Sequence, residues 1–318
     1  MRSRIILLLA TIFSTLTCVS RRVDLPPIIP ATRDASLPEL VDIINQRQEI
    51  STFIARAELQ FVTRDKAEEG KGRRYRSGQG RILLARPGHI LLTIEAPLLS
   101  ANIADMASDG NRFQLLIYPE EYRALIFGSN QKQYATEARK LDSDPKLRQA
   151  GPLVNIRPQH FTGAFLFDPI EIENVHFEEA RPVEDDDRPN AKKDQKIVRS
   201  YYVVSDTRRG EQTTRWKYWF DRTRDMTLAR LQQFDSRGLL AGDITYSQYL
   251  PPEPKTGVRF PTEIYIDRPY EDYALRITLR SDSIQVNREI PSTAFTLQPP
   301  PEWKDTLRRV NLDKKASK

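Results

Sequence analysis

The periodicity of apolar residues changes early in the chain from a helical to a strand pattern, and this change most constrains the fold. In residues 53–61 every second side chain is apolar and the intervening ones are mostly polar, as in a half-buried strand. Segments of the same kind follow at residues 80–86, 90–96, 101–108, 112–118, 122–127, 200–206, 214–221, 226–234, 239–249, 259–267 and 272–286. Turn-forming residues such as Asp109-Gly110 separate many of them, which favours hairpins in meander order.

A long antiparallel meander exposes its edges and one apolar face unless it curls. We therefore predict a mainly β (α+β) fold with a single curled antiparallel sheet of about 11–12 strands. The sheet is expected to form an incomplete barrel with helices packed in its concave face. Such an interior is apolar and suits an acyl chain.

One amphipathic helix is predicted over residues 37–50, with Ser36 as its N-cap and Pro38 in its first turn. Residues 130–196 interrupt the strand pattern as a helical and loop insertion. Within it, residues 134–149 have helical composition, residues 155–172 are apolar, and the charged residues 184–196 are expected to form a solvent loop.

The N-terminal residues have the pattern of an export signal. Arg2 and Arg4 precede an apolar stretch at residues 5–16, which is shorter than the ~20 residues of a membrane span. The single cysteine, Cys18, ends this stretch, so residues 1–18 are interpreted as a signal peptide with a lipobox. The alternative is an incidental cysteine near an ordinary cleavage site, because Thr15-Leu16-Thr17 departs from the usual lipobox.

The flanks of the main domain differ in composition from its centre. The proline-rich residues 19–36 are predicted to be an extended tether, and the basic residues 299–318 a loose tail. The half-barrel domain is then residues 37–298. Lysine and arginine number 49 against 43 aspartate and glutamate, interleaved along the chain. This mixture indicates a solvated surface and argues against nucleic-acid binding.

No constellation of catalytic residues or metal ligands is evident in the sequence. The three histidines lack the spacing of metal ligands, and motifs of hydrolases, phosphotransferases and dinucleotide enzymes are missing. Ser129 and Lys132 have the bare S-x-x-K spacing without its partner motifs. Asp105 is interpreted as a solvent-face strand residue and Asp109 as a turn residue. We expect no enzyme activity, no cofactor and no metal. The aromatic residues 216–220 favour core packing over a ligand pocket or a membrane contact.

The residues Gly80 to Pro87, Ile90 to Pro97, Asp105 to Gly110 and Phe113 to Pro119 resemble the outer-membrane lipoprotein-sorting group that contains the carrier LolA and its receptor LolB. The resemblance covers residues 37–122 and, in general pattern, residues 200–297. It implies an incomplete β-barrel with a hydrophobic cavity for acyl chains, and it adds no active-site residue.

In the receptor a loop between two strands presents an apolar tip, and Leu98 and Leu99 occupy the comparable place here; burial of both at a strand end is an equal alternative. The other candidate lipid contacts are Ile94, Ile103, Met106, Phe113 and Leu115. Carriers of this group are unlipidated, so Cys18 favours the receptor-like role. The greater length and the insertion at residues 130–196 are departures from the receptor as well.

Two functional hypotheses follow from this resemblance and from the residues. The first is a membrane-anchored periplasmic protein that binds lipid or lipoprotein acyl chains non-covalently during outer-membrane lipoprotein or lipid sorting. Its anchor would be the acyl chains, such as palmitate, on Cys18, at the periplasmic side of the outer membrane. The alternative is a scaffold lipoprotein of the cell envelope that tethers a protein partner, with a barrel filled by its own side chains.

Overall fold

The computed structural model describes residues 25–63, 73–74, 77–97, 101–131, 151–207 and 213–314. The predicted signal peptide with Cys18, the predicted tip of Leu98 and Leu99, and the predicted helical segment 134–149 lie outside the described residues. Contacts divide the chain into two units. The larger comprises Ala31–Ala180 and Ser200–Lys318, and the smaller comprises Met1–Pro30 and Arg181–Arg199.

The larger unit contains one sheet, in which sixteen strands of the described residues take part. They are β1 (Thr52–Thr63), β2 (Arg73–Arg74), β3 (Gly78–Ala85), β4 (His89–Glu95), β5 (Asn102–Asp109), β6 (Arg112–Ile117), β7 (Ala124–Ser129), β8 (Val175–Ala180), β11 (Tyr201–Asp206), β12 (Trp216–Asp221), β13 (Thr227–Phe234), β14 (Leu240–Tyr249), β15 (Pro261–Arg268), β16 (Tyr273–Leu279), β17 (Gln285–Val286) and β18 (Arg308–Asn311). The mainly β fold class and all twelve predicted strand segments are confirmed, although the last segment divides into β16 and β17.

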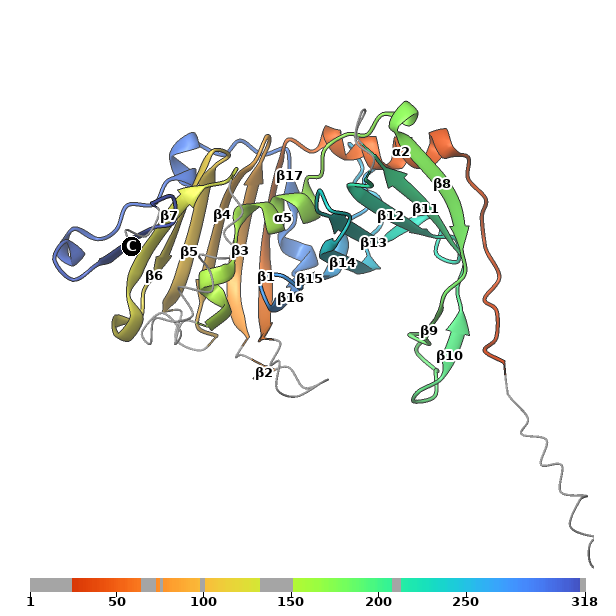
Figure 1. Ribbon diagram of the computed structural model, residues 1–318, viewed down its shortest axis with the longest axis horizontal. Helices are drawn as coiled ribbons and strands as arrows, with labels where there is room; N and C mark the ends of the chain where they lie inside the picture. The colour runs from red at the N-terminus through yellow and green to blue at the C-terminus, as the bar shows by residue number, and fades with distance from the viewer. Residues whose placement is uncertain are drawn as a thin grey trace, which may run out of the picture. The chain divides into compact units, whose positions relative to one another are not determined.

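Strand β1 lies near the middle of the sheet, paired with β3 on one side and β16 on the other. The strand order is β18-β7-β6-β5-β4-β3-β1-β16-β15-β14-β13-β12-β11-β8, so two meanders meet at β1. All neighbours are antiparallel except β18 and β7, which are parallel. The sheet is curled and not closed, with β18 and β8 at its edges (Figure 1).

The described residues include two α-helices, α2 (Leu37–Asn45) and α5 (Pro158–Phe165). The 3₁₀ segments are η1 (Gln46–Glu49), η2 (Glu120–Tyr122), η3 (Gly151–Asn155), η4 (Ile172–Asn174), η5 (Ser281–Ser283), η6 (Ser292–Phe295) and η7 (Pro301–Trp303). Helix α2 and η1 together match the helix predicted over residues 37–50. Ser36 occupies the N-cap with an extended backbone, but its side chain makes no capping hydrogen bond. None of the described helices is both long and apolar enough to span a membrane.

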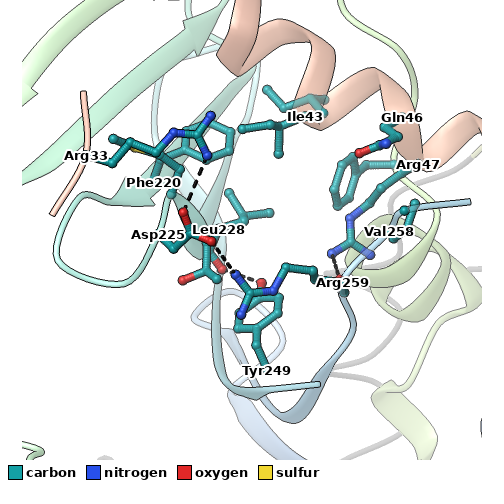
Figure 2. Close-up of a pocket in the computed structure, with 15 residues that line it drawn as sticks. Arg33, Ile43, Gln46, Arg47, Phe220, Asp225, Leu228, Tyr249, Val258 and Arg259 are labelled. Carbon is teal, nitrogen blue, oxygen red and sulfur yellow. Dashed lines mark hydrogen bonds and ion pairs between the residues drawn. The ribbon is translucent and has the colours of Figure 1, made fainter. Parts of the chain in front are cut away.

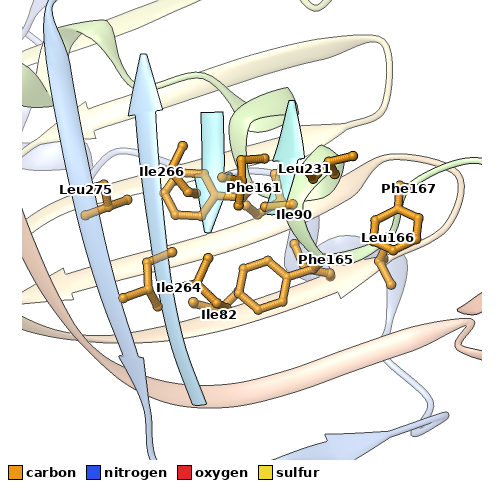
Figure 3. Close-up of a cluster of buried hydrophobic side chains, with 14 of the residues drawn as sticks. Ile82, Ile90, Phe161, Phe165, Leu166, Phe167, Leu231, Ile264, Ile266 and Leu275 are labelled. Carbon is orange, nitrogen blue, oxygen red and sulfur yellow. The ribbon is translucent and has the colours of Figure 1, made fainter. Parts of the chain in front are cut away.

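Helix α5 packs against the apolar face of the sheet. Phe161 and Phe165 belong to the same buried cluster as strand residues from both meanders (Figure 3). The Phe165 ring lies 5.2 Å from that of Phe53 on β1, and the hydroxyl of Tyr246 on β14 donates to the carbonyl of Ala164 at 2.8 Å. These contacts place α5 on the core side of the sheet. That helices fill the concave face of the curled sheet stays a prediction.

The C-terminal residues are not the loose tail that their composition predicts. Residues 308–311 form β18 beside β7, Leu307 is buried, and Trp303 packs on Tyr118 with ring centres 5.3 Å apart. Sequence reasoning missed these contacts because the apolar residues that make them are widely spaced among prolines and basic residues.

The smaller unit contains a short antiparallel hairpin where the sequence predicted a solvent loop. Its strands are β9 (Val183–Asp185) and β10 (Lys196–Val198), and Ile28 forms a parallel bridge with Val198. Arg199 pairs with Asp187 at 2.5 Å. Each strand has only three residues, and half of the six are charged, so no apolar alternation indicated the strands in the sequence.

Candidate functional site

A pocket lies between the α2–η1 segment and the ends of strands β12, β13 and β14 in the larger unit (Figure 2). Its volume is about 150 Å³. The residues that line it are Arg33, Ile43, Ile44, Gln46, Arg47, Phe167, Phe220, Asp225, Met226, Thr227, Leu228, Tyr249, Gly257, Val258 and Arg259. A second, more open hollow beside β14, β15 and β16 is lined mainly by polar residues, including Glu263 and Arg276.

The walls of the pocket are mostly apolar. Ile43 and Ile44 come from the helical stripe of α2, which turns its apolar side chains towards the sheet because they recur at helical spacing. Phe220 on β12 and Leu228 on β13 face them, and Val258 closes the far side (Figure 2). A ligand in this pocket therefore meets mainly apolar side chains.

The segment before α2 is fixed to the end of the sheet. The backbone nitrogen of Thr32 donates to the carbonyl of Arg222 at 2.8 Å, and the guanidinium of Arg222 pairs with Asp34. Residues 31–36, predicted as part of an extended tether, are thus docked, and Arg33 is held at the pocket rim.

Asp225 lies on the rim between two arginines. Its carboxylate accepts from Arg33 at 3.4 Å and from Arg259 at 3.2 Å (Figure 2). Because these side chains are substantially exposed, each pair contributes at most about 1 kcal/mol. Asp225 and Met226 both have positive φ, 52° and 53°, in the turn between β12 and β13. Methionine rarely adopts this conformation, so the turn at the pocket is backbone-strained.

Arg47 forms the inner wall and is only 8% exposed. It extends from η1, and its Nη2 donates to the carbonyl of Arg259 at 3.1 Å. The guanidinium carbon lies 5.2 Å from the ring centre of Phe167 and 5.7 Å from that of Phe260. Nearby, burial raises the pKa of Tyr249 to about 12, so this phenol is neutral and its hydroxyl donates to the carbonyl of Leu228 at 2.6 Å.

A second group of polar side chains is buried beneath α5. The Nδ1 atom of His160 contacts the hydroxyl of Tyr273, and Nε2 lies 3.5 Å from the carboxylate of Glu271, which pairs with Arg268 at 2.9 Å. Burial is the main cause that lowers the pKa of His160 to about 4. This group joins α5 to the β15–β16 hairpin, and no member of it lines the pocket.

The sequence-predicted lipid contacts lie elsewhere in the larger unit. Ile94, Met106, Phe113 and Leu115 are buried in the main core, and Ile103 packs against it. Met106 and Leu115 are direct cross-strand partners on β5 and β6. None of these five lines the pocket, so their contact with lipid stays a prediction.

Sequence reasoning missed the arginines of the pocket. One signal was present: Leu40, Ile44 and Arg47 recur at helical spacing, which places a cation on the apolar face of the predicted helix. Arg259 and Asp225 gave no comparable signal, because their approach depends on the positions of separate turns. Phe220 and its neighbour Tyr218 are buried as core packing predicts, yet Phe220 also faces the pocket.

Among the residues that the structure describes, no cluster of three metal-ligating side chains is found. Asp109 is a turn residue as predicted, since it accepts from the backbone nitrogens of Asn111 and Arg112 at 2.9 and 2.8 Å. The assignment of Asp105 to the solvent face is wrong, because this residue is only 8% exposed and Tyr118 donates to its carboxylate at 2.5 Å.

No family model and no curated protein matches the chain. Solved structures do show similarity. A LolA superfamily protein from Nitrosomonas europaea has 11% identity and a TM-score of 0.42, over 80% of this chain and 96% of the other. A DUF1329 family protein from Desulfovibrio piger has 13% identity and a TM-score of 0.40, over 82% and 95%.

A third similar structure is an outer membrane lipoprotein-sorting protein domain from Vibrio parahaemolyticus. It has 11% identity and a TM-score of 0.39, over 82% of this chain and 97% of the other.

Proposed function

We propose that this protein binds the acyl chains of lipids or lipoproteins non-covalently in the cell envelope and performs no catalysis. The observation that carries the proposal is the pocket beside α2, with apolar walls contributed by a helix and three strands. Binding there needs burial of alkyl groups, at about 0.8 kcal/mol per CH₂ removed from water. The finer proposal is a role in outer-membrane lipoprotein or lipid sorting.

The size of the pocket limits how much lipid enters it without movement. A cavity of about 150 Å³ admits one molecule of about the size of benzene. A whole acyl chain is longer, so we propose that the pocket holds one end of it. The remainder requires displacement of α2 or of core residues such as Phe167.

The competing proposal is a scaffold lipoprotein whose interior is filled by its own side chains. The burial of the candidate contacts Met106 and Phe113 in the main core favours it. The two proposals differ in whether a ligand occupies the pocket.

Occupancy is tested by mass spectrometry of an organic extract from the purified protein, compared with Leu228→Trp, which fills the pocket. The exposed Leu239→Trp, one residue before β14, is the matched control. Stoichiometric acyl lipid in the wild type and Leu239→Trp, and its loss in Leu228→Trp, would support the lipid-binding proposal. Ligand-free wild-type protein would favour the scaffold.

The anchor is a separate proposal, supported by the lipobox-like position of Cys18. Cys18→Ala is expected to move the protein from the membrane fraction to the soluble fraction, because it removes the acylated residue. Intact-mass measurement of the membrane-bound protein checks the acyl modification directly, and an unmodified Cys18 would refute it.

A further inference from the structure

We infer that the pocket beside α2 recognises an anionic amphiphile, with Arg47 as the group that binds the negatively charged head. The inference rests on the proposed lipid-binding function and adds the chemical class of the ligand, an alkyl chain that ends in a carboxylate or a phosphate monoester. Its basis is the unequal distribution of carboxylates among the three arginines of the pocket.

The two rim arginines have carboxylate partners. Arg259 pairs with Asp225, and Arg33 pairs with both Asp225 and Glu39. Arg47, the most buried of the three, forms no ion pair with any of the described residues. The known contacts of its guanidinium are a hydrogen bond to the carbonyl of Arg259, two aromatic ring faces, and a polar contact with the hydroxyl of Tyr249.

A buried guanidinium without a carboxylate is costly. Removal of a charge from water is offset only by excellent pairing, and a cation–π contact returns about 0.5–2 kcal/mol. The guanidinium presents five N–H donors in a planar fork, which matches the paired oxygens of a carboxylate or phosphate. An anion in the pocket would supply the missing charge beside the apolar side chains of Ile43 and Val258.

The rim does not cancel this positive charge. Three arginines and one aspartate line the pocket, so an anion that enters meets an excess of cations. In addition, the Nε atom of Arg259 is buried and has no hydrogen-bond partner in the described part of the chain. The pocket therefore holds one unpaired buried donor, on Arg259, beside the buried charge of Arg47.

The apolar walls distinguish an amphiphile from a free anion. Ile43, Leu228 and Val258 offer no hydrogen bond to a hydrated phosphate, but they bury the first carbons of an alkyl chain. The head and the chain therefore recognise different parts of one pocket, the head at Arg47 and the chain at the walls.

The test is isothermal titration calorimetry of the purified full chain with four probes at the same pH: dodecanoate, methyl dodecanoate, dodecyl phosphate and inorganic phosphate. We expect dodecanoate and dodecyl phosphate to bind at least tenfold more tightly than the methyl ester. Inorganic phosphate is expected to bind weakly, because it lacks the chain.

The second experiment removes the positive charge of Arg47 from the protein, whereas the methyl ester removes the negative charge from the ligand. Arg47→Met retains an unbranched side chain and should abolish the preference for dodecanoate over its methyl ester. Arg81→Met, at an exposed position on β3, should leave the preference unchanged. If Arg47→Met fails to fold, the comparison of acid and ester on the wild type still decides the question.

Equal affinity for dodecanoate and its methyl ester would overturn the inference and leave the lipid-binding proposal intact. No binding of either would overturn both. Inorganic phosphate bound as tightly as dodecyl phosphate would identify a free-anion site and overturn the assignment of an amphiphile.

Discussion

The Nε2 atom of His160 lies 3.5 Å from the Oε1 atom of Glu271, joining helix α5 to the turn between β15 and β16. The other ring nitrogen contacts the hydroxyl of Tyr273. Since burial, with Arg268 and Arg157 nearby, lowers the pKa of His160 to about 4, the ring is neutral at pH 7. Protonated Nε2 then donates towards Glu271, and Nδ1 accepts from Tyr273.

The burial of His160 predicts a loss of stability in mild acid. Unfolded histidine takes up a proton near pH 6.5, whereas folded His160 resists protonation until about pH 4. Between these values the unfolded state binds more protons, so stability falls as the pH decreases. The full loss amounts to about 3 kcal/mol. Urea unfolding at pH 7 and at pH 4.5 measures most of it.

Other groups also titrate in this range, so the variant His160→Gln isolates the contribution. Its stability at pH 7 falls because packing changes, but its decline between pH 7 and pH 4.5 should be smaller than that of the wild type. The exposed His176→Gln is the control and should retain the wild-type decline. Parallel pH profiles for wild type and His160→Gln would contradict the assignment.

The strands could be predicted because burial of one face imposes alternation on the residues. In β1, Phe53 and Leu59 are fully buried while Arg56 and Glu58 are exposed, and the sequence shows this directly. The rule fails where both faces are covered. In β5, Asp105 lies opposite Leu116 and accepts from Tyr118, and these two neighbours belong to a second apolar cluster with Leu125 and Leu307. Asp105 is therefore buried at a position that alternation assigns to solvent.

The pocket was beyond sequence reasoning for a related reason. Arg47 contacts Phe260 and the backbone of Arg259, although more than two hundred residues separate them in the sequence. The central position of β1 between two meanders brings these segments together. Periodicity reports which face of an element is apolar, but it does not report which distant elements share that face. The helix was therefore predictable, and the role of its one buried arginine was not.

Two glycine substitutions should have opposite effects on stability. A Cβ atom on Gly80 of β3 would lie 2.5 Å from the carbonyl oxygen of Thr93 and 2.9 Å from the side chain of Leu59. Gly80→Ala should therefore destabilise the fold by about 1–3 kcal/mol, as overpacking does.

The matched variant is Gly163→Ala on α5, where the nearest atom, on Trp216, is 3.7 Å away. Alanine in a helix is favoured over glycine by about 0.5–1 kcal/mol. Gly163→Ala should therefore be neutral or stabilising. Denaturant midpoints of both variants test the pair, and a tolerated Gly80→Ala would show that β3 and β4 separate easily at this point.

The packing of α5 on the sheet predicts a large effect of Phe161→Ala. Phe161 is fully buried in the core cluster, and its truncation leaves a cavity among strand residues (Figure 3). The expected loss is about 3–5 kcal/mol in the free energy of unfolding. Phe177→Ala, at a 40% exposed site on β8, should cost far less. A loss for Phe161→Ala as small as that for Phe177→Ala would mean that the packing of α5 contributes little to stability.

The docked C-terminal segment predicts a local effect of Trp303→Ala. The Trp303 ring meets Tyr118 at 76°, and the guanidinium carbon of Arg123 lies 4.2 Å from the ring centre. An edge-on aromatic contact and a cation–π contact together contribute about 1–2 kcal/mol. Their loss should release β18 from β7, because β18 follows directly on the Trp303 turn. Hydrogen exchange at residues 308–311 measures this release, with the exposed Lys304→Ala as control. Unchanged protection in Trp303→Ala would show that the parallel pairing of β18 with β7 holds the segment without the aromatic contact.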